Sequence, residues 1–354
     1  MKKICLLALG TLLLTSCDIT IRPLTSSESS SASSEGSSVV VSTSSANESS
    51  SDSITVSTSS TKPSTSSSSK PSTSSSSSKP SVSSSASSSS VSSKPSSSQS
   101  SSASLEIVIN EDAGNYYNNI NFDQSPTSLK TSLSKLIKNH DSLSYNDLWD
   151  AFKTTDRRSD GTVWDMYSNE KFKFGNDQCG NYKVEGDCYN REHSIPKSWF
   201  DDKAPMYTDL FHLVPTDGYV NNRRSNYPFG EVSSATYTSK NGSKLGRSAL
   251  SSYSGTVFEP IDEYKGDFAR IYMYFVTCYQ DKNITATSEA KSTFVKSGQY
   301  YTLTDYAKEL FLSWNELDPV SKKEIERNQN VYRLQGNRNP FVDIPALAEI
   351  IFND

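Results

Sequence analysis

Hydrophobic and polar positions follow a helical period in most of the chain after residue 125. Leu129, Leu133 and Ile137 share one helical face, because apolar residues three or four apart lie on the same side of a helix. Ser321 followed by Glu324 is the pattern of a capping box, which marks a helix start. The stretches that we expect to be helices are residues 129–137, 144–152, 268–279, 304–317, 321–332 and 346–352.

Strand signals are shorter and fewer. Residues 161–167, 188–195 and 209–214 each have the length and composition of a strand. A break at Gly218 separates the last of these from a short helix expected within residues 220–226. The order strand, loop, strand, short helix predicts a ββα unit, and the fold class is a helix-rich α+β single domain.

The helical stretch at residues 268–279 differs from the others. It carries apolar side chains on more than one side, including Phe268, Ile271, Tyr272 and Phe275. A helix that is hydrophobic nearly all round is buried. We therefore expect this segment to form the central core helix.

The N-terminal residues have a different pattern. Lys2 and Lys3 precede an apolar run, Ile4 to Leu14, which is too short to span a membrane. The run ends at Cys17 in a sequence that resembles a bacterial lipobox. We expect residues 1–17 to be a lipoprotein signal peptide with a lipid on Cys17, and an ordinary cleaved signal peptide is the alternative.

Residues 18–104 are dominated by Ser, with recurring Lys-Pro-Ser and no aromatic residue. Such a composition cannot bury enough apolar surface to offset chain entropy, so we expect a disordered linker, or stalk. Residues 105–354 hold all four Trp and are long enough for one domain with its own core.

The candidate catalytic and ligand-binding residues lie between positions 191 and 226. They are Arg191, Glu192, His193, Asp209, His212, Asn221, Arg223, Arg224 and Asn226. Carboxylate and carboxamide oxygens bind hard divalent cations, and a neutral imidazole accepts a proton near physiological pH. Together with guanidinium groups, these residue types suit hydrolysis of a phosphodiester. Neighbours inside a strand point to opposite faces, so Glu192 and His193 need a twist or bulge to share one site.

This set of motifs resembles the endonuclease I family of secreted, non-specific nucleases, whose site is a ββα-metal (His-Me) finger. The matching segments are residues 192–193, 209–215, 218–226, 265–272 and 314–341. The resemblance covers nearly all of residues 113–354, and the joint occurrence of the motifs makes it specific.

The resemblance implies a role for each matched residue. His193 is expected to be the general base, Glu192 and Asn221 the ligands of Mg²⁺ or another divalent cation such as Ca²⁺ or Mn²⁺, and Arg224 a phosphate contact or an orienting residue. The residues expected to have supporting roles are Asp209, His212 and Asn226. Alternatives stay open for three of these residues. Asn221 can cap the short helix, His212 can be a structural partner, and Asp209 can be a turn or strand-start residue.

The sequence departs from the family pattern in two places. Phe211 stands where many members have His, so His212 alone remains in that segment. The loop from Pro196 to Asp209 is short and offers no Arg to the scissile phosphate. Arg191 and Arg223 remain candidates for that contact.

The implied function is a metal-dependent, sequence-non-specific endonuclease that acts outside the cell on DNA, with RNA as a second substrate, and leaves 5′-phosphate ends. It would be held at the membrane by its lipid anchor, also exist in released form, and need no obligate protein partner. The alternative is a catalytically weak surface lipoprotein that binds nucleic acid. A zinc hydrolase built on His193 and His212 lacks a third His ligand with suitable spacing.

Charge and cysteine content refine this picture. The chain has a net charge of −5, and residues 105–354 carry 28 basic against 35 acidic groups, so phosphate binding must rely on a local basic patch. Cys179 and Cys188 can close a small disulfide loop outside the cytoplasm or remain free thiols. The remaining His140 lies in an amphipathic stretch and has no chemical partner nearby in sequence.

Overall fold

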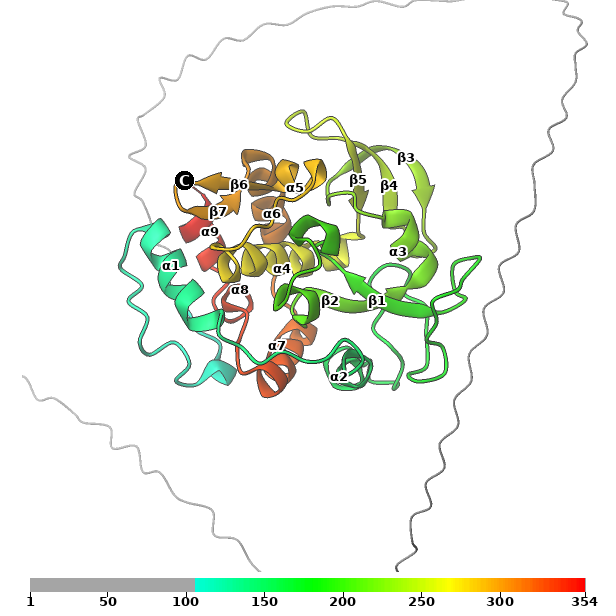
Figure 1. Ribbon diagram of the computed structural model, residues 1–354, viewed down its shortest axis with the longest axis horizontal. Helices are drawn as coiled ribbons and strands as arrows, with labels where there is room; N and C mark the ends of the chain where they lie inside the picture. Colours follow the sequence, from blue (N-terminus) through cyan, green and yellow to red (C-terminus); the bar gives the residue numbers. More distant parts are fainter. Residues whose placement is uncertain (1–105, 354) are drawn as a thin grey trace, which may run out of the picture. The chain divides into compact units, whose positions relative to one another are not determined.

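The computed structural model describes residues 106–353. The expected signal peptide, the lipidated Cys17 and the Ser-rich linker lie outside these residues. Figure 1 shows helices and small antiparallel sheets arranged around one central helix, in agreement with a mixed helical and sheet domain.

The helices and strands follow in a simple order along the chain. They are α1 (Pro126–Ile137), α2 (Leu148–Thr155), β1 (Tyr189–His193), β2 (Leu213–Asp217), α3 (Gly218–Arg224), β3 (Val232–Thr238), β4 (Lys244–Ser248), β5 (Thr256–Glu259), α4 (Lys265–Cys278), α5 (Ser288–Thr293), β6 (Phe294–Ser297), β7 (Tyr300–Leu303), α6 (Asp305–Leu317), α7 (Lys322–Gln335), α8 (Pro340–Asp343) and α9 (Leu347–Phe352).

Helix α4 is the centre of the core. Every one of its 14 residues is buried, and α1, α6 and α8 pack against it (Figure 1). The prediction of a core helix at residues 268–279 is therefore confirmed. Gly266 permits a close approach at the start of α4, because a Cβ there would lie 2.0 Å from the carbonyl oxygen of Asp318.

Helix starts and ends agree with the sequence signals in several places. Ser321 and Glu324 form the predicted capping box of α7, and Thr304 caps α6 by accepting from the backbone of Ala307. The start of α2 differs from the prediction. The helix was expected from residue 144 but begins at Leu148, because the hydroxyl of Ser144 accepts from the backbone N–H of Asp147 and closes a turn before the helix.

One strand prediction was wrong, and another had the wrong bounds. Residues 161–167 form only an isolated bridge between Arg157 and Val163, because their backbone groups bond to surrounding loops. Residues 209–212 form a turn, and β2 begins at Leu213. The three-stranded sheet β3–β4–β5 and the hairpin β6–β7 were missed. β3 is largely exposed and its alternation of apolar and polar residues is interrupted by a register shift between Val232 and Ser234, and β6 and β7 have only four residues each.

Strands β1 and β2 pair antiparallel, with Glu192 opposite Val214, and α3 follows β2 without a loop. This confirms the predicted order of strand, loop, strand and helix. Helix α3 begins at Gly218, earlier than expected, and its cap is Asp217, whose side chain accepts from the backbone of Val220. Asn221 lies inside α3, so the interpretation of Asn221 as its N-cap was wrong.

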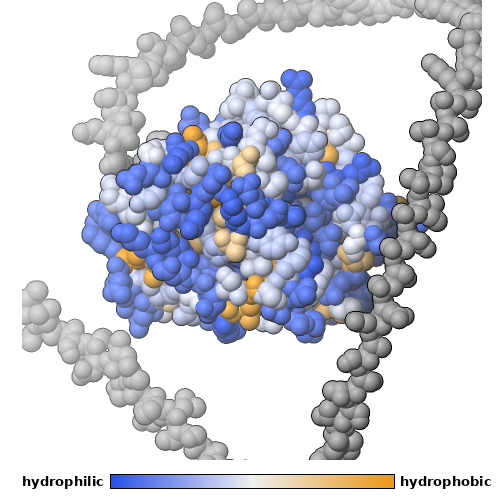
Figure 2. Space-filling view, viewed as in Figure 1, coloured by the Kyte–Doolittle hydropathy of each residue, from blue (hydrophilic) through white to orange (hydrophobic). Residues whose placement is uncertain are grey.

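Among residues 106–353, no helix is long and apolar enough to cross a membrane. The face shown in Figure 2 is largely hydrophilic, with small, separate apolar patches. The apolar side chains of this part of the chain gather instead in the core around α4.

Cys179 and Cys188, for which the sequence left two possibilities, are joined by a disulfide. The closed loop between them immediately precedes β1. We expect the double variant Cys179→Ser/Cys188→Ala to lose about 2–3 kcal/mol of stability, because the bond restricts the unfolded chain. Thermal unfolding would then begin roughly 5–10 °C lower. A reducing agent should lower the wild-type Tm by the same amount, and an unchanged Tm in the variant would contradict the expectation.

Candidate active site

The end of β1 and the second half of α3 border a hollow of about 240 Å³. Its lining includes Glu192, His193, Asn221, Arg224 and Asn226, five of the residues proposed from the sequence. Antiparallel pairing of β1 with β2, and the direct passage from β2 into α3, bring segments about 30 residues apart to this place.

Glu192 and His193 reach the same hollow because of where β1 ends. Inside a strand, neighbouring side chains point to opposite faces. His193 is the last residue of β1, however, and the chain bends at Ser194, whose backbone N–H donates to the carbonyl of His212 at 2.9 Å. The bend allows both side chains to line one hollow.

Glu192 is buried and oriented by two donors. Its Oε1 accepts from the hydroxyl of Tyr167 at 2.8 Å and from Nη1 of Arg224 at 2.9 Å. Within the described part of the chain, no donor bonds to Oε2, and the residue lines the hollow. Burial raises the pKa of Glu192 to about 7, and the charge of Arg224 opposes that shift. A cation at the free oxygen would favour the ionised carboxylate further.

His193 is held in one tautomer. Its Nε2 lies 3.0 Å from the carbonyl oxygen of Tyr207, which can only accept, so Nε2 carries the proton and Nδ1 keeps its lone pair. The ring stacks on Tyr145 at a centroid distance of 6.1 Å. Burial, followed by the neighbouring His212, lowers the pKa of His193 to about 3, so the imidazole is neutral at physiological pH.

Asn221 presents an oxygen to the same hollow. Its Nδ2 donates to Oδ1 of Asn190 at 2.8 Å, which sets the orientation of the amide and leaves Oδ1 available. Asn190 was missed in the sequence, although strand alternation places it on the same face of β1 as Glu192. Asn226 is exposed at the edge of the hollow.

Arg224 is turned inward. It is 1% exposed, and its Nη1 also donates to the carbonyl of His193 at 3.0 Å. Its Nη2 donates to the carbonyl of Ser194 and to the hydroxyl of Tyr272. Since both amino groups are engaged by the protein, these contacts favour an orienting role over contact with a phosphate.

Asp209 lies outside the hollow, in a buried polar network. Its Oδ2 accepts from Tyr274 and Tyr279 at 2.9 and 2.7 Å, and its Oδ1 accepts from the backbone of Phe211 and from Gln335, both at 3.0 Å. Burial alone would raise the pKa of Asp209, but the surrounding groups lower it. These contacts support the structural role that the sequence left open for Asp209.

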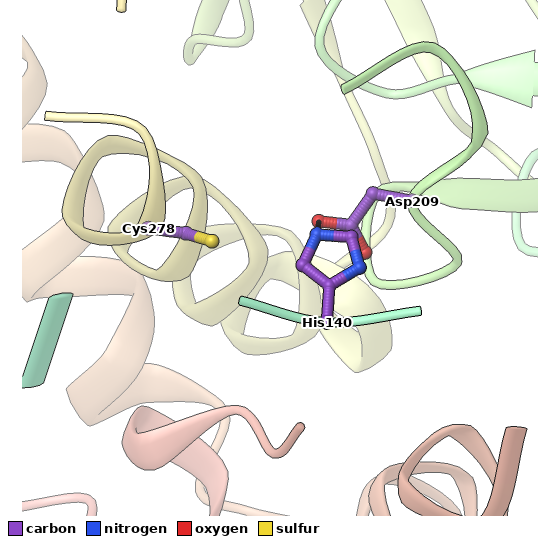
Figure 3. Close-up of side chains that lie close together, drawn as sticks. All are labelled: His140, Asp209 and Cys278. Atoms are coloured by element: carbon purple, nitrogen blue, oxygen red, sulfur yellow. Dashed lines mark ion pairs between the residues drawn. The ribbon is translucent and has the colours of Figure 1, made fainter. Parts of the chain in front are cut away.

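The third histidine joins this network. Figure 3 shows the ring of His140 against the carboxylate of Asp209, with Cys278 to one side. His140 Nε2 lies 2.9 Å from the hydroxyl of Tyr279 and 3.8 Å from Asp209 Oδ2. No sequence signal pointed to this contact, because the partners lie about 70 and 140 residues away.

Among residues 106–353, His140, Asp209 and Cys278 are the group of three side chains whose spacing could hold a metal ion. Two observations argue against such a centre. Both carboxylate oxygens of Asp209 already accept two hydrogen bonds each. Burial raises the pKa of the Cys278 thiol well above its usual range, whereas a metal requires the thiolate. The group is better described as a buried hydrogen-bonded network.

His212 stabilises the end of β1. Its Nε2 lies 2.6 Å from the carbonyl of Met206, and its ring packs against Phe275 and, at a centroid distance of 5.6 Å, against His193. It does not line the hollow. Its own carbonyl accepts from the backbone and the hydroxyl of Ser194, so it helps fix the end of β1.

The burial of His212 predicts a pH effect on stability. Burial lowers its pKa from 6.5 to about 4, so below pH 6.5 the unfolded chain binds a proton that the folded protein does not. Stability must therefore fall as pH falls from about 6.5 toward 4, by about 2 kcal/mol between pH 7 and pH 5 from this residue.

The test is urea unfolding at pH 7 and pH 5 for the wild type and for His212→Gln, which retains a donor for Met206. The variant should be less stable at pH 7 but lose about 2 kcal/mol less on acidification. An equal loss in both proteins would contradict the assignment.

Comparison with known proteins places the chain in context. It is 35% identical to an extracellular ribonuclease of Bacillus subtilis (strain 168) over 231 residues, covering 64% of this chain and 74% of the relative. It is 33% identical to an extracellular ribonuclease of Bacillus amyloliquefaciens over 255 residues, covering 71% and 82%. A periplasmic deoxyribonuclease of Aeromonas hydrophila is 27% identical over 142 residues, covering 39% and 48%.

The model of the family Endonuclease I matches residues 125–346. This range includes every residue that lines the hollow between β1 and α3. The match covers more than half of the chain and agrees with the relatives above. The chain therefore belongs to the Endonuclease I family.

Proposed function

We propose that this protein is an extracellular, divalent-metal-dependent endonuclease that hydrolyses phosphodiester bonds without sequence preference. One observation carries the proposal. A neutral imidazole with a free Nδ1 and two side chains with free oxygens, Glu192 and Asn221, line the same small hollow. Those groups are what metal-assisted hydrolysis of a phosphodiester requires.

The donor set fits a hard cation. Oε2 of Glu192 and Oδ1 of Asn221 have no hydrogen-bond donor within residues 106–353, and each side chain is oriented through its other polar atom. One carboxylate and one amide oxygen leave most positions to water and substrate phosphate, which suits Mg²⁺ or a similar ion such as Mn²⁺ or Ca²⁺. When bound, the ion would stabilise negative charge on the phosphoryl and leaving oxygens.

The remaining chemistry belongs to the chain. Nδ1 of His193 accepts a proton from the attacking water, while Nε2 stays bonded to Tyr207 and keeps the ring in place. Arg224 holds Glu192 and the end of β1 in position through Nη1 and Nη2. Attack in line with the 3′ oxygen breaks the P–O3′ bond and leaves a 5′-phosphate and a 3′-hydroxyl.

Both DNA and RNA are proposed substrates. Two of the relatives are named ribonucleases and a third is named a deoxyribonuclease. Attack by an activated water does not require a ribose 2′-hydroxyl, so the same groups can act on either polymer. The preference for DNA expected from the sequence thus becomes a question for experiment.

The names of the relatives and the N-terminal pattern support the proposed location outside the cell. The relatives are named extracellular or periplasmic, which supports action outside the cell. The Cys17 lipid anchor and the linker of residues 18–104 stay proposals, because they lie outside the described residues. Together they would tether the nuclease domain at the cell surface.

The test is digestion of supercoiled plasmid and of a long RNA by residues 105–354, with and without EDTA. We expect cleavage of both with Mg²⁺, Mn²⁺ or Ca²⁺, none in EDTA, and ends that a ligase joins without prior phosphorylation. Retention of plasmid without cleavage in any metal would instead favour the alternative, a nucleic-acid-binding lipoprotein. Cleaved ends that carry a 3′-phosphate would contradict the proposed direction of attack.

A further inference from the structure

A second hollow, of about 390 Å³, adjoins the first beside the disulfide loop. Its lining includes Trp149, Gln178, Gly180 and Asn190, together with Tyr145 and Arg191, and the last two also line the first hollow. Arg191 therefore lies where the two hollows meet. No acidic residue lines the second hollow, so a polyanion entering it meets no repulsive charge from its walls.

The guanidinium of Arg191 packs against two aromatic rings. Its Cζ lies 3.6 Å from the ring centroid of Tyr145 and 4.4 Å from that of Trp149. Nη1 donates to the backbone carbonyl of Tyr145 at 2.6 Å. The guanidinium also makes a side-chain hydrogen bond to Tyr145, and no carboxylate of residues 106–353 lies within ion-pair distance of it. Arg191 is thus an oriented cation without a carboxylate partner.

The other cationic side chains near the site are bonded to groups of the protein. Arg224 is buried and bonded to Glu192 and to backbone carbonyls. Arg223 donates to the hydroxyl of Tyr219 through Nε and Nη2 and lines neither hollow. Lys197 lines the first hollow, but its Nζ is 2.8 Å from Asp202. Of these four, Arg191 alone lines both hollows, and it has no carboxylate partner among residues 106–353.

We propose that Arg191 binds a phosphate of the nucleic-acid strand that flanks the cleaved bond, and that the second hollow receives the adjoining nucleotide. This inference rests on the proposed function. A planar guanidinium bonds to phosphate oxygens with fixed geometry, and its aromatic neighbours reduce the side-chain freedom lost on binding. Arg191 then supplies the local basic contact with phosphate that a domain with a net negative charge needs.

The experiment measures binding without cleavage. The probes are a single-stranded DNA and a single-stranded RNA oligonucleotide in EDTA, titrated with the wild type, Arg191→Met and Arg191→Lys at several salt concentrations. Arg191→Met should raise Kd about 10–100-fold. The slope of log Kd against log salt should become shallower by about 0.7, the value for one phosphate on a single strand. Arg191→Lys should keep the slope but bind with intermediate affinity, since it retains charge without the fork.

Controls separate this role from a structural one. Thermal unfolding should show that each variant remains folded, and Arg223→Met, an exposed arginine outside both hollows, should bind within about twofold of the wild type. In steady-state cleavage, Arg191→Met should raise KM with little change in kcat, because a flanking phosphate is bound equally before and during reaction.

Unchanged Kd and salt slope in a folded Arg191→Met protein would overturn the proposal, as would a loss confined to kcat or a larger effect of Arg223→Met. If the proposed function itself were wrong, the result would differ from this one. The wild type would then cleave no nucleic acid in any metal, whatever its affinity for the oligonucleotides.

Discussion

Replacement of His193 by alanine is expected to lower kcat by about 10²–10⁴-fold, the usual contribution of a general base. The imidazole is the group in the hollow whose neutral form and free Nδ1 suit proton transfer from water. Single-turnover cleavage of a labelled oligonucleotide in saturating metal measures the effect without interference from product release. Binding of the same oligonucleotide in EDTA should change little, because a proton acceptor contributes mainly in the transition state.

Two further measurements distinguish loss of a base from loss of structure. Added imidazole should restore part of the activity of His193→Ala, since the small molecule can occupy the space beside Tyr145 and Phe200. His193→Gln can still donate to Tyr207 but cannot accept a proton usefully, so it should be as inactive as the alanine variant. Full activity in either variant would eliminate His193 as the base.

Replacement of Glu192 by glutamine is expected to raise the metal concentration for half-maximal activity at least tenfold, and to lower kcat/KM by about 10²–10³-fold at fixed metal. The remaining amide oxygen can still accept from Tyr167 and Arg224, while the amide nitrogen would replace the oxygen offered to the cation. Metal titration of the cleavage rate, with Mg²⁺ and Mn²⁺ in separate series, measures the shift.

A matched control exists in the same domain. Glu324 is a buried carboxylate paired with Arg270 at 2.6 Å, as Glu192 is paired with Arg224, but it lines neither hollow. Both Glu→Gln variants leave a buried guanidinium without its counter-charge and should lose stability. The metal requirement should change in Glu192→Gln and stay the same in Glu324→Gln. Equal metal requirements in wild type and Glu192→Gln would remove Glu192 from the ligand set.

Asn221→Ala offers a second route to the same conclusion. It removes the other proposed oxygen ligand and leaves the ion pair of Glu192 and Arg224 untouched. We expect the metal requirement to rise about 10–100-fold, with thermal stability close to that of the wild type. This variant keeps the ligand hypothesis testable where Glu192→Gln does not fold.

Local sequence signals predicted the helices well. The apolar stripe of residues 129–137 and the nearly all-round apolar segment 268–279 both form helices where expected, because a 3.6-residue period reports directly on burial of one face or of all faces. The capping box at Ser321 worked for the same reason, since its partners lie only three residues apart. The exposed strand β3 left no such signal.

Local sequence signals also predicted part of the arrangement of the polar residues. Sequence alone determined which polar side chains are available near the strand and helix, and it predicted Glu192, His193 and Asn221 as the core of the proposed site. It also predicted the strand, loop, strand and helix that bring them together. Strand alternation could have added Asn190, which orients Asn221.

Only the tertiary structure decided how the similar residues divide between roles. Arg224 turns inward to Glu192, while Arg191 packs against Tyr145 and Trp149 without a carboxylate partner. Asp209 bonds to Tyr279 in a buried network rather than facing the hollow. These choices depend on partners 30 to 70 residues away, and local periodicity carries no information about which distant side chain will supply a buried charge with its hydrogen bonds.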